Sequence, residues 1–172
     1  MKAVLLDRDG TLMQEMEYCR DPALVRLFPG VPEGLGSLKE AGFLNLLVTN
    51  QSGIGRGLIT MAEYEAVHAR LVELLAPASL DGVYMCPDAP DVGSVRRKPA
   101  PGLLVAAAAQ RNLEMARCWM VGDKASDIEC GRRVGCRTVL VLTGYGREQG
   151  GTGADHVAAD FPAAVEYILR QP

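Results

Sequence analysis

Short apolar segments alternate along the chain with longer segments in which apolar residues recur at helical spacing. The short segments span 3–7, 43–50, 81–86, 118–123 and 137–143. The helical patterns span 31–42, 60–76, 101–113, 125–135 and 161–171. Because the short segments are apolar at consecutive positions, we expect strands that are buried on both faces. Such strands alternating with helices predict an α/β fold with a doubly wound parallel sheet.

Local signals mark the ends of several predicted helices. Thr60 and Glu63 have the spacing of a capping box, which predicts a helix that begins after Thr60. Gly42 and Gly135 follow helical patterns and predict C-terminal caps. Three stretches without regular pattern follow predicted strands: 13–30, 86–99 and 144–156. Ligands of doubly wound sheets bind beyond the carboxyl ends of the strands, so we look for function in these loops.

The composition narrows the possible partners. The chain has 172 residues, 48% of them apolar, which suits one globular domain over 1–172, and we expect it to be a monomer. A net charge of −3 gives no reason to expect nucleic acid or an anionic membrane as partner. No apolar run approaches the roughly 20 residues of a spanning helix, and Asp7 interrupts the N-terminal apolar stretch, which argues against a secretion signal. Five cysteines without a C-x-x-C pair indicate reduced thiols in the cytoplasm.

Polar residues follow three of the predicted strands and precede one helix. They are Asp7 and Asp9 after the first strand, Thr49, Asn50 and Gln51 after the second, Asp123, Lys124 and Asp127 after the fourth, and Arg97 and Lys98 before the helix at 101–113. In a parallel sheet all these groups face one crevice. Carboxylates, a hydroxyl–amide pair and cations in one crevice predict a site for a hard divalent cation and a phosphate.

Asp7 and Asp9 pose an electrostatic problem. Two unit charges about 4 Å apart repel by roughly 4 kcal/mol at an effective dielectric of 20. A Mg²⁺ ion bound by Asp7, by Asp123 and by a backbone carbonyl near Asp9 would neutralise this crowding. One aspartate could then attack phosphorus to form an aspartyl-phosphate. The second carboxylate could protonate the leaving oxygen and later activate water, while Thr49 and Lys98 hold the phosphoryl oxygens.

Four segments, in order, resemble the signature motifs of the haloacid dehalogenase superfamily of phosphatases. These are DRDGT, VTNQSG, RKPAPGLL and VGDKASD. The longer stretches VTNQSGIGRG and MVGDKASDIECG are similar to the branch that holds the D,D-heptose 1,7-bisphosphate and histidinol-phosphate phosphatases, over residues 3 to 143. The resemblance implies a Rossmann-like core without a large cap domain and the Mg²⁺-dependent hydrolysis of a small sugar phosphate. Heptose 1,7-bisphosphate, a lipopolysaccharide precursor, is the leading substrate, and histidinol phosphate is the alternative.

The resemblance also assigns roles to individual residues. It makes Asp7 the nucleophile, Asp9 the general acid and base, and Asp123 a Mg²⁺ ligand. The groups that it places on the phosphate or the rest of the substrate are Thr49, Asn50, Gln51, Ser52, Arg97, Lys98 and Lys124, with Glu15 and Tyr18 from the loop after the first strand.

Some interpretations stay open at this point. Asp127 is either a carboxylate that stabilises the first turn of its helix or a support of the active site. Arg56 is either a solvated loop residue or a substrate contact. A phosphoaccepting receiver domain would also place aspartates, a threonine and a lysine at the edge of a parallel sheet. Such a domain, however, carries its phosphoaccepting aspartate after a middle strand and has no general acid two residues downstream.

The loop before RKP departs from the resemblance. Relatives carry a zinc site there with Cys-x-His and Cys-x-Cys ligands, whereas this chain has Cys86 followed by Asp88, and Ser94 and Arg96 at the later positions. Structural zinc requires four Cys or His ligands, and this loop offers one. We therefore expect no zinc.

The purified protein should accordingly contain no stoichiometric zinc, and Cys86→Ala should keep nearly full phosphatase activity, because one thiolate cannot complete a tetrahedral site. Elemental analysis after metal-free purification measures the first quantity. A content of about one zinc per chain would contradict the prediction.

Overall fold

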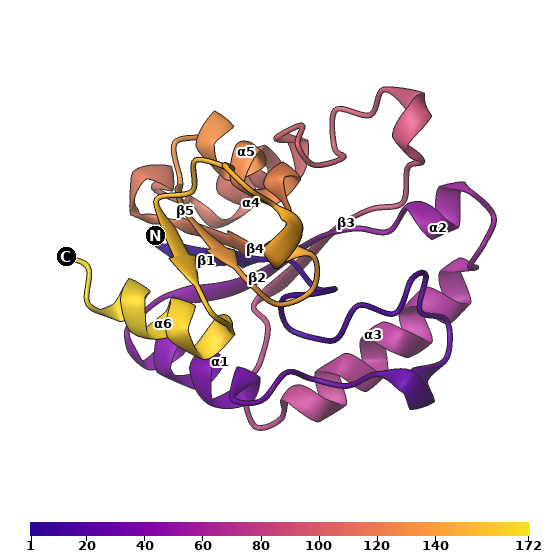
Figure 1. Cartoon of the computed structure of the whole chain (residues 1–172), viewed down its shortest axis with the longest axis horizontal. Helices are drawn as coiled ribbons and strands as arrows, with labels where there is room; N and C mark the ends of the chain where they lie inside the picture. The colour runs from indigo at the N-terminus through magenta and orange to yellow at the C-terminus, as the bar shows by residue number, and fades with distance from the viewer.

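The structure, a computed structural model, describes residues 1–172 and contains one parallel sheet of six strands in the order β3-β2-β1-β4-β5-β6 (Figure 1). The strands are β1 (Ala3–Leu6), β2 (Leu44–Asn50), β3 (Gly82–Cys86), β4 (Trp119–Gly122), β5 (Arg137–Val141) and β6 (His156–Ala158). Every neighbouring pair is parallel. The predicted fold class is confirmed.

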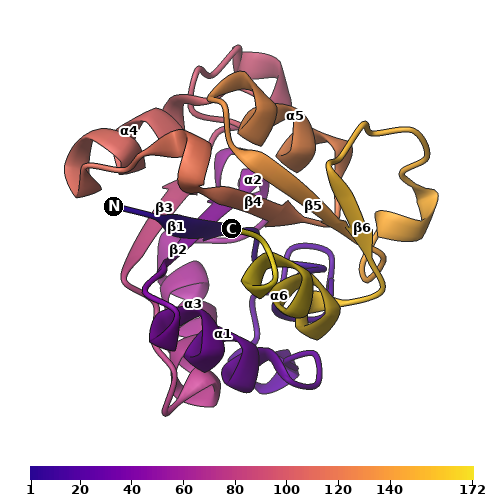
Figure 2. The same ribbon diagram turned by 90° about the vertical axis from the view of Figure 1, so that its left-hand side faces the viewer.

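Helices cover both faces of the sheet. They are α1 (Val31–Glu40), α2 (Ser52–Gly55), α3 (Met61–Leu75), α4 (Gly102–Arg111), α5 (Ala125–Arg133) and α6 (Phe161–Leu169). Figure 2 shows α1, α3 and α6 on one side of the sheet and α4 and α5 on the other. The chain has no large cap domain, as predicted, and none of its helices is long and apolar enough to span a lipid bilayer.

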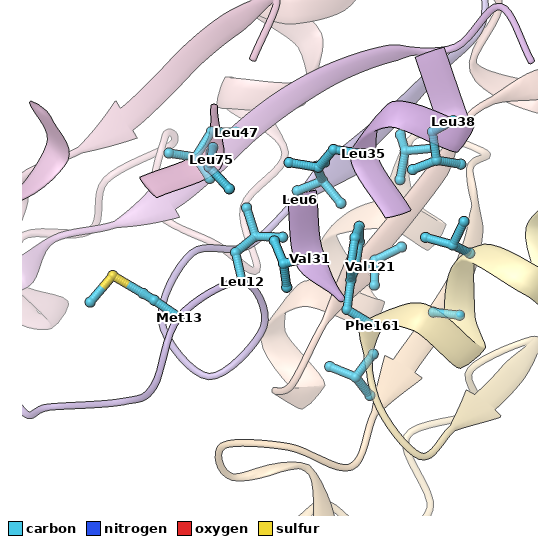
Figure 3. Packing of buried hydrophobic residues seen from close by; sticks show 14 of the residues in the cluster. Leu6, Leu12, Met13, Val31, Leu35, Leu38, Leu47, Leu75, Val121 and Phe161 are labelled. Carbon is cyan, nitrogen blue, oxygen red and sulfur yellow. The ribbon is translucent and has the colours of Figure 1, made fainter. Parts of the chain in front are cut away.

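Each face of the sheet has its own hydrophobic core. Val4 and Leu6 belong to the larger cluster, whereas Ala3 and Leu5 belong to the smaller one on the other face. Successive side chains of a strand point to opposite faces, which explains why β1 is apolar at every position. In the larger cluster, Leu6 packs with residues of α1, α3 and α6 (Figure 3).

The predicted capping box at the start of α3 is present. The side chain of Thr60 accepts a hydrogen bond from the Glu63 backbone N–H at 3.1 Å, and the Glu63 carboxylate accepts one from the Thr60 N–H at 2.7 Å. Two unpaired N–H groups at the start of the helix are thereby satisfied.

Two elements were not predicted from the sequence. β6 has three residues, too few for a recognisable pattern, and lies within and just beyond a stretch that looks irregular. Asp155 fixes this edge strand, since its carboxylate accepts hydrogen bonds from the N–H (2.7 Å) and hydroxyl (2.8 Å) of Thr138 in β5. The short α2 is a single glycine-rich turn that the Gly55 N–H holds against Pro87, through a 2.9 Å bond to its carbonyl.

Candidate active site

A cleft of about 670 Å³ opens at the carboxyl edge of the sheet. Its walls come from the segments after β1, β2 and β4 and from the loop between β3 and α4. The predicted residues that line it are Asp7, Asp9, Glu15, Tyr18, Asn50, Gln51, Ser52, Arg97, Lys98 and Lys124, together with Asp127. Two further predicted residues, Thr49 and Asp123, are buried beside the cleft, while Arg56 lies outside its lining.

Lys98 is the central cation of the cleft floor. Its ammonium group lies 2.7 Å from Asp7 Oδ1, 2.7 Å from Asp127 Oδ1 and 2.7 Å from the carbonyl oxygen of Val48. These three acceptors match the three N–H donors of an ammonium group. Burial lowers the pKa of Lys98, but the carboxylates of Asp127 and Asp7 outweigh this effect and hold the pKa above its ordinary value. Lys98 is therefore a fixed positive charge.

Asn50 holds Lys98 in place through the backbone. The Asn50 side-chain amide donates to the Lys98 carbonyl at 3.1 Å and accepts from the Lys98 N–H at 3.1 Å. This reciprocal pair joins the end of β2 to the segment before α4, 48 residues away in the sequence. The Lys98 side chain then has a defined starting point from which it reaches Asp7.

Three buried carboxylates lie together beneath the cleft. Oxygens of Asp7, Asp123 and Asp127 are within 4.8 Å of one another. Desolvation by burial raises the pKa of Asp7 to about 6, although Lys98 lowers it, and desolvation together with the charge of Asp7 raises the pKa of Asp123 to about 7. The cluster thus holds more negative charge than Lys98 neutralises.

Asp123 presents an oxygen that no protein group satisfies. Its Oδ2 accepts a hydrogen bond from the Tyr145 N–H at 2.8 Å, but its buried Oδ1 has no partner. Gly10 and Gly144 approach this carboxylate closely, and a Cβ on either would lie 2.2 Å from Oδ2. Both glycines also have positive φ angles, +82° and +53°, so the chain needs glycine at both positions.

The donor set fits a hard divalent cation. Carboxylate oxygens are the ligands that Mg²⁺ takes in proteins, with water completing its shell. An unpartnered, buried Asp123 oxygen beside two further carboxylates has the chemistry of such a site. A cation bound there would also lower the mutual repulsion that raises the pKa of Asp123.

Asp9 points to a different set of partners. Arg8 donates from Nε to Asp9 Oδ2 at 3.0 Å and from Nη2 to Oδ1 at 3.1 Å. Gln51 Nε2 donates to Asp9 Oδ2 at 2.8 Å and to Thr49 Oγ1 at 2.8 Å. The Asp9 side chain remains 15% exposed, toward the cleft.

Asp127 satisfies both interpretations that the sequence left open. Its Oδ2 accepts a hydrogen bond from the Lys124 N–H at 3.0 Å, at the start of α5, and its Oδ1 pairs with Lys98 at 2.7 Å. One carboxylate therefore stabilises the first turn of the helix and holds the lysine of the cleft floor.

The outer wall of the cleft is formed by the loop after β1 and by residues near α5. Lys124 pairs with Glu15 at 3.2 Å and lies 4.7 Å from the ring centroid of Tyr145. Tyr18, 40% exposed, lines the same opening. These side chains lie at the opening of the cleft, where a substrate would enter.

Sequence reasoning missed several lining residues, among them Arg8, Ser126, Arg133 and Tyr145. Tyr145 follows β5 at the carboxyl edge, a position that could have singled it out. Arg8 lies between the two aspartates in the sequence, but nothing in the sequence indicates where its side chain points. Arg133 ends α5, where nothing in the sequence points to the cleft.

The loop that follows β3 is held by hydrogen bonds around a buried thiol. Cys86 Sγ lies 3.4 Å from Asp88 Oδ2 and 3.7 Å from Ser94 Oγ. Arg97 reaches back from the cleft wall to donate to the Asp88 carbonyl at 3.2 Å. These contacts connect the loop to a residue that lines the cleft, and the expected lack of zinc stays a prediction.

Comparisons with known proteins show the family to which the chain belongs. The family model for HAD-hydrolase-like proteins matches residues 95–164. The D-glycero-D-manno-heptose-1,7-bisphosphate 7-phosphatase of Thermosynechococcus vestitus is 42% identical, over 96% of this chain and 94% of the relative. The corresponding enzyme of Bordetella bronchiseptica is 34% identical over 99% of both chains.

A solved structure has the same fold over the whole chain. The crystal structure of D,D-heptose 1,7-bisphosphate phosphatase from B. bronchiseptica, complexed with magnesium and phosphate, superposes with a TM-score of 0.93 and 34% identity and covers 100% of both chains. The protein is thus a phosphatase of the haloacid dehalogenase type, and the receiver-domain alternative falls away. Within that class, the chain belongs to the D-glycero-D-manno-heptose-1,7-bisphosphate 7-phosphatase family.

The raised pKa values predict how stability responds to pH and metal. Asp7 and Asp123 bind protons more tightly in the folded than in the unfolded protein, so their contribution is complete below about pH 4. It is lost as the pH rises through about 6 and about 7. Mg²⁺ competes with those protons, and it should raise the melting temperature more near pH 8 than near pH 5.

Thermal melts with Mg²⁺ or with EDTA at the two pH values measure this effect. Asp123→Asn should lose most of the response, because it removes a charged ligand. An equal shift of melting temperature at both pH values would contradict the assignment of the carboxylates as the metal site.

Proposed function

We propose that the chain is a Mg²⁺-dependent phosphatase that removes the 7-phosphate of D-glycero-D-manno-heptose 1,7-bisphosphate through an aspartyl-phosphate. The observation that carries this proposal is Asp7, which lies on the cleft floor, pairs with the fixed charge of Lys98 and belongs to the carboxylate cluster. Support for the substrate comes from the relatives, whose names specify this ester. Support for the metal comes from the magnesium of the similar crystal structure.

Asp7, Asp123 and Asp127 are the residues that would hold Mg²⁺, and the backbone carbonyl of Asp9 stays a predicted further ligand. When bound, the ion neutralises charge that develops on the phosphoryl oxygens and lets an anionic substrate approach the carboxylates.

In the first step, a carboxylate oxygen of Asp7 attacks phosphorus. The O–P bond to Asp7 forms while the bond from phosphorus to the sugar oxygen breaks. Protonated Asp9 gives its proton to that oxygen, so the sugar leaves as an alcohol and Asp9 becomes a carboxylate. The pairing of Asp7 Oδ1 with Lys98 at 2.7 Å keeps the attacking group oriented.

In the second step, water hydrolyses the phosphoenzyme. The Asp9 carboxylate accepts a proton from water while the water oxygen attacks phosphorus, and the bond to Asp7 breaks. Inorganic phosphate leaves, Asp7 is regenerated, and Asp9 is protonated again for the next cycle.

Other cleft residues hold the parts of the substrate that do not react. Lys98, Thr49, Asn50 and Ser52 are proposed phosphate-binding groups, because Lys98 contacts Asp7 and the other three lie at or just after the end of β2, the strand next to β1. Arg97 and Lys124 supply positive charge farther out, and Glu15, Tyr18 and Gln51 supply polar contacts for the sugar.

We further propose that the enzyme is a cytoplasmic monomer. Five free cysteines, all buried, support a reducing compartment. The net charge of −3 and the polar cleft give no reason to expect nucleic acid or a membrane as partner.

Substitution of the two aspartates tests the mechanism. Asp7→Asn should abolish turnover and phosphoenzyme formation, because an amide cannot replace the carboxylate nucleophile. Asp9→Asn should slow turnover by about 100- to 10,000-fold. Steady-state rates and trapping of ³²P-labelled enzyme measure both effects, and wild-type activity in Asp7→Asn would refute the proposal.

A phosphate-release assay with Mg²⁺ tests substrate and metal together. Heptose 1,7-bisphosphate should have a higher kcat/KM than histidinol phosphate, and ³¹P NMR should show loss of the 7-phosphate. EDTA should abolish the activity, and Ca²⁺ should replace Mg²⁺ poorly because its larger shell misplaces the oxygens. Preference for histidinol phosphate would assign the alternative substrate, and full activity after chelation would exclude the metal.

A further inference from the structure

Arg8 is a buried arginine whose one ionic partner is its sequence neighbour. Its side chain is 1% exposed and forks onto both oxygens of Asp9, at 3.0 and 3.1 Å. Consecutive residues of a strand point to opposite faces, so such a pair does not form within a regular strand. A local change of chain direction must bring the two side chains together.

That change is a tight turn directly after β1. The Arg8 carbonyl accepts hydrogen bonds from the N–H groups of Leu12 (3.0 Å) and Met13 (3.1 Å), and Gly10 has a φ of +82°. The chain therefore turns back on itself after Arg8, and Asp9, within this turn, lines the cleft. The turn makes the Arg8–Asp9 fork possible.

The guanidinium group has two further contacts, while its buried Nη1 has no hydrogen-bond partner. It lies 5.4 Å from the ring centroid of Tyr64 on α3, and its Nη2 donates to Gln51 Oε1 at 3.1 Å. Gln51 in turn donates to Asp9 Oδ2 at 2.8 Å. Arg8, Gln51 and Asp9 form a closed ring of hydrogen bonds.

This ring contains all the hydrogen-bond donors that Asp9 has in the protein. Bidentate arginine–carboxylate pairs fix the plane of the carboxylate, which a single lysine donor does not do. A buried guanidinium also cannot leave its partner without a large desolvation penalty. The buried side chains of Arg8 and Gln51 therefore set the orientation of Asp9 toward the cleft.

We propose that Arg8 is the positioning residue for Asp9: it holds the carboxyl group where a proton can pass to the leaving sugar oxygen and later be taken from water. Although Arg8 contributes to the lining of the cleft, its side chain is only 1% exposed, and we assign it no contact with substrate or phosphorus. This inference rests on the proposed function, in which Asp9 is the general acid and base. The inference adds Arg8 as the residue that orients Asp9.

The test compares two esters that differ in their need for an acid. The sugar alkoxide of heptose 1,7-bisphosphate must be protonated as it leaves, whereas p-nitrophenolate leaves without a proton. The ratio of their kcat/KM values reports steps up to departure of the leaving group, before the phosphoenzyme is hydrolysed. Arg8→Met should lower kcat/KM about 100-fold for the heptose ester and less than about 3-fold for p-nitrophenyl phosphate.

The same variant should produce a burst of p-nitrophenolate equal to the enzyme concentration. Formation of the phosphoenzyme stays fast with this ester, while its hydrolysis needs Asp9 as base and becomes slow. A merely structural defect would reduce the amount of active enzyme and produce no burst.

A double mutant shows whether Arg8 acts through Asp9. In an Asp9→Asn background, Arg8→Met should cause less than about 3-fold further loss in kcat/KM for the heptose ester, since the group that it aims is already gone. If the losses in kcat/KM of the two single variants multiply in the double mutant, the proposal is overturned. It is also overturned if Arg8→Met lowers kcat/KM equally for both esters.

Two further variants guard against failure to fold. Arg8→Lys keeps a buried positive charge but loses the bidentate pair with Asp9. It should shift the ratio of the two kcat/KM values in the same direction as Arg8→Met, by a smaller factor. An unchanged ratio in a folded Arg8→Lys protein would also overturn the proposal. Arg70→Met, at an exposed arginine of α3 that pairs with Glu73, is the matched control and should leave the ratio unchanged.

The outcomes separate this inference from the proposed function. A wild-type protein that hydrolyses neither ester in the presence of Mg²⁺ would refute the proposed function. A wild-type protein and an Asp9→Asn variant that behave as expected, together with an Arg8→Met variant of normal ratio, would refute the positioning role alone.

Discussion

The buried contact of Lys98 with Asp7 and Asp127 is the interaction on which the rest of the cleft depends. An ammonium group without water needs acceptors for all its donors, and the two carboxylates and the Val48 carbonyl supply them, each at 2.7 Å. Asp7 directly follows β1, Asp127 is in α5 and Val48 is in β2, so one charge fixes the relative positions of three parts of the chain. Asn50 adds a backbone anchor for the lysine.

The charge balance of the site follows from that contact. Three carboxylates lie within 4.8 Å of one another, and Lys98 contacts two of them, Asp7 and Asp127. Burial, together with the excess negative charge, raises the pKa values of Asp7 and Asp123. A divalent cation removes this excess and satisfies the unpartnered oxygen of Asp123. Glycines at 10 and 144 make room for the carboxylate, so backbone geometry and electrostatics serve the same site.

The sheet order explains why these groups converge. β1 lies between β2 and β4, so the residues that follow these three strands meet at one edge. The chain first builds the sheet from β1 through β2 to β3 on one side, and then returns to place β4, β5 and β6 on the other side of β1. Such a reversal of strand order opens a crevice at this point. The segments on either side carry Glu15, Lys124 and Arg97 to the walls of this crevice.

The sequence by itself determined five of the six strands, the sheet class and the polar residues at the strand ends, because apolar runs and their terminal polar residues are local patterns. It indicated that Asp7, Lys98 and Asp123 would meet, since parallel strands bring their carboxyl ends to one edge. Only the tertiary structure decided the partners of individual side chains. Asp127 accepts a hydrogen bond at the start of its helix and also pairs with Lys98. Arg8 pairs with Asp9 because the chain turns back at Gly10. Such choices depend on a turn and on burial by α3, which no local pattern encodes.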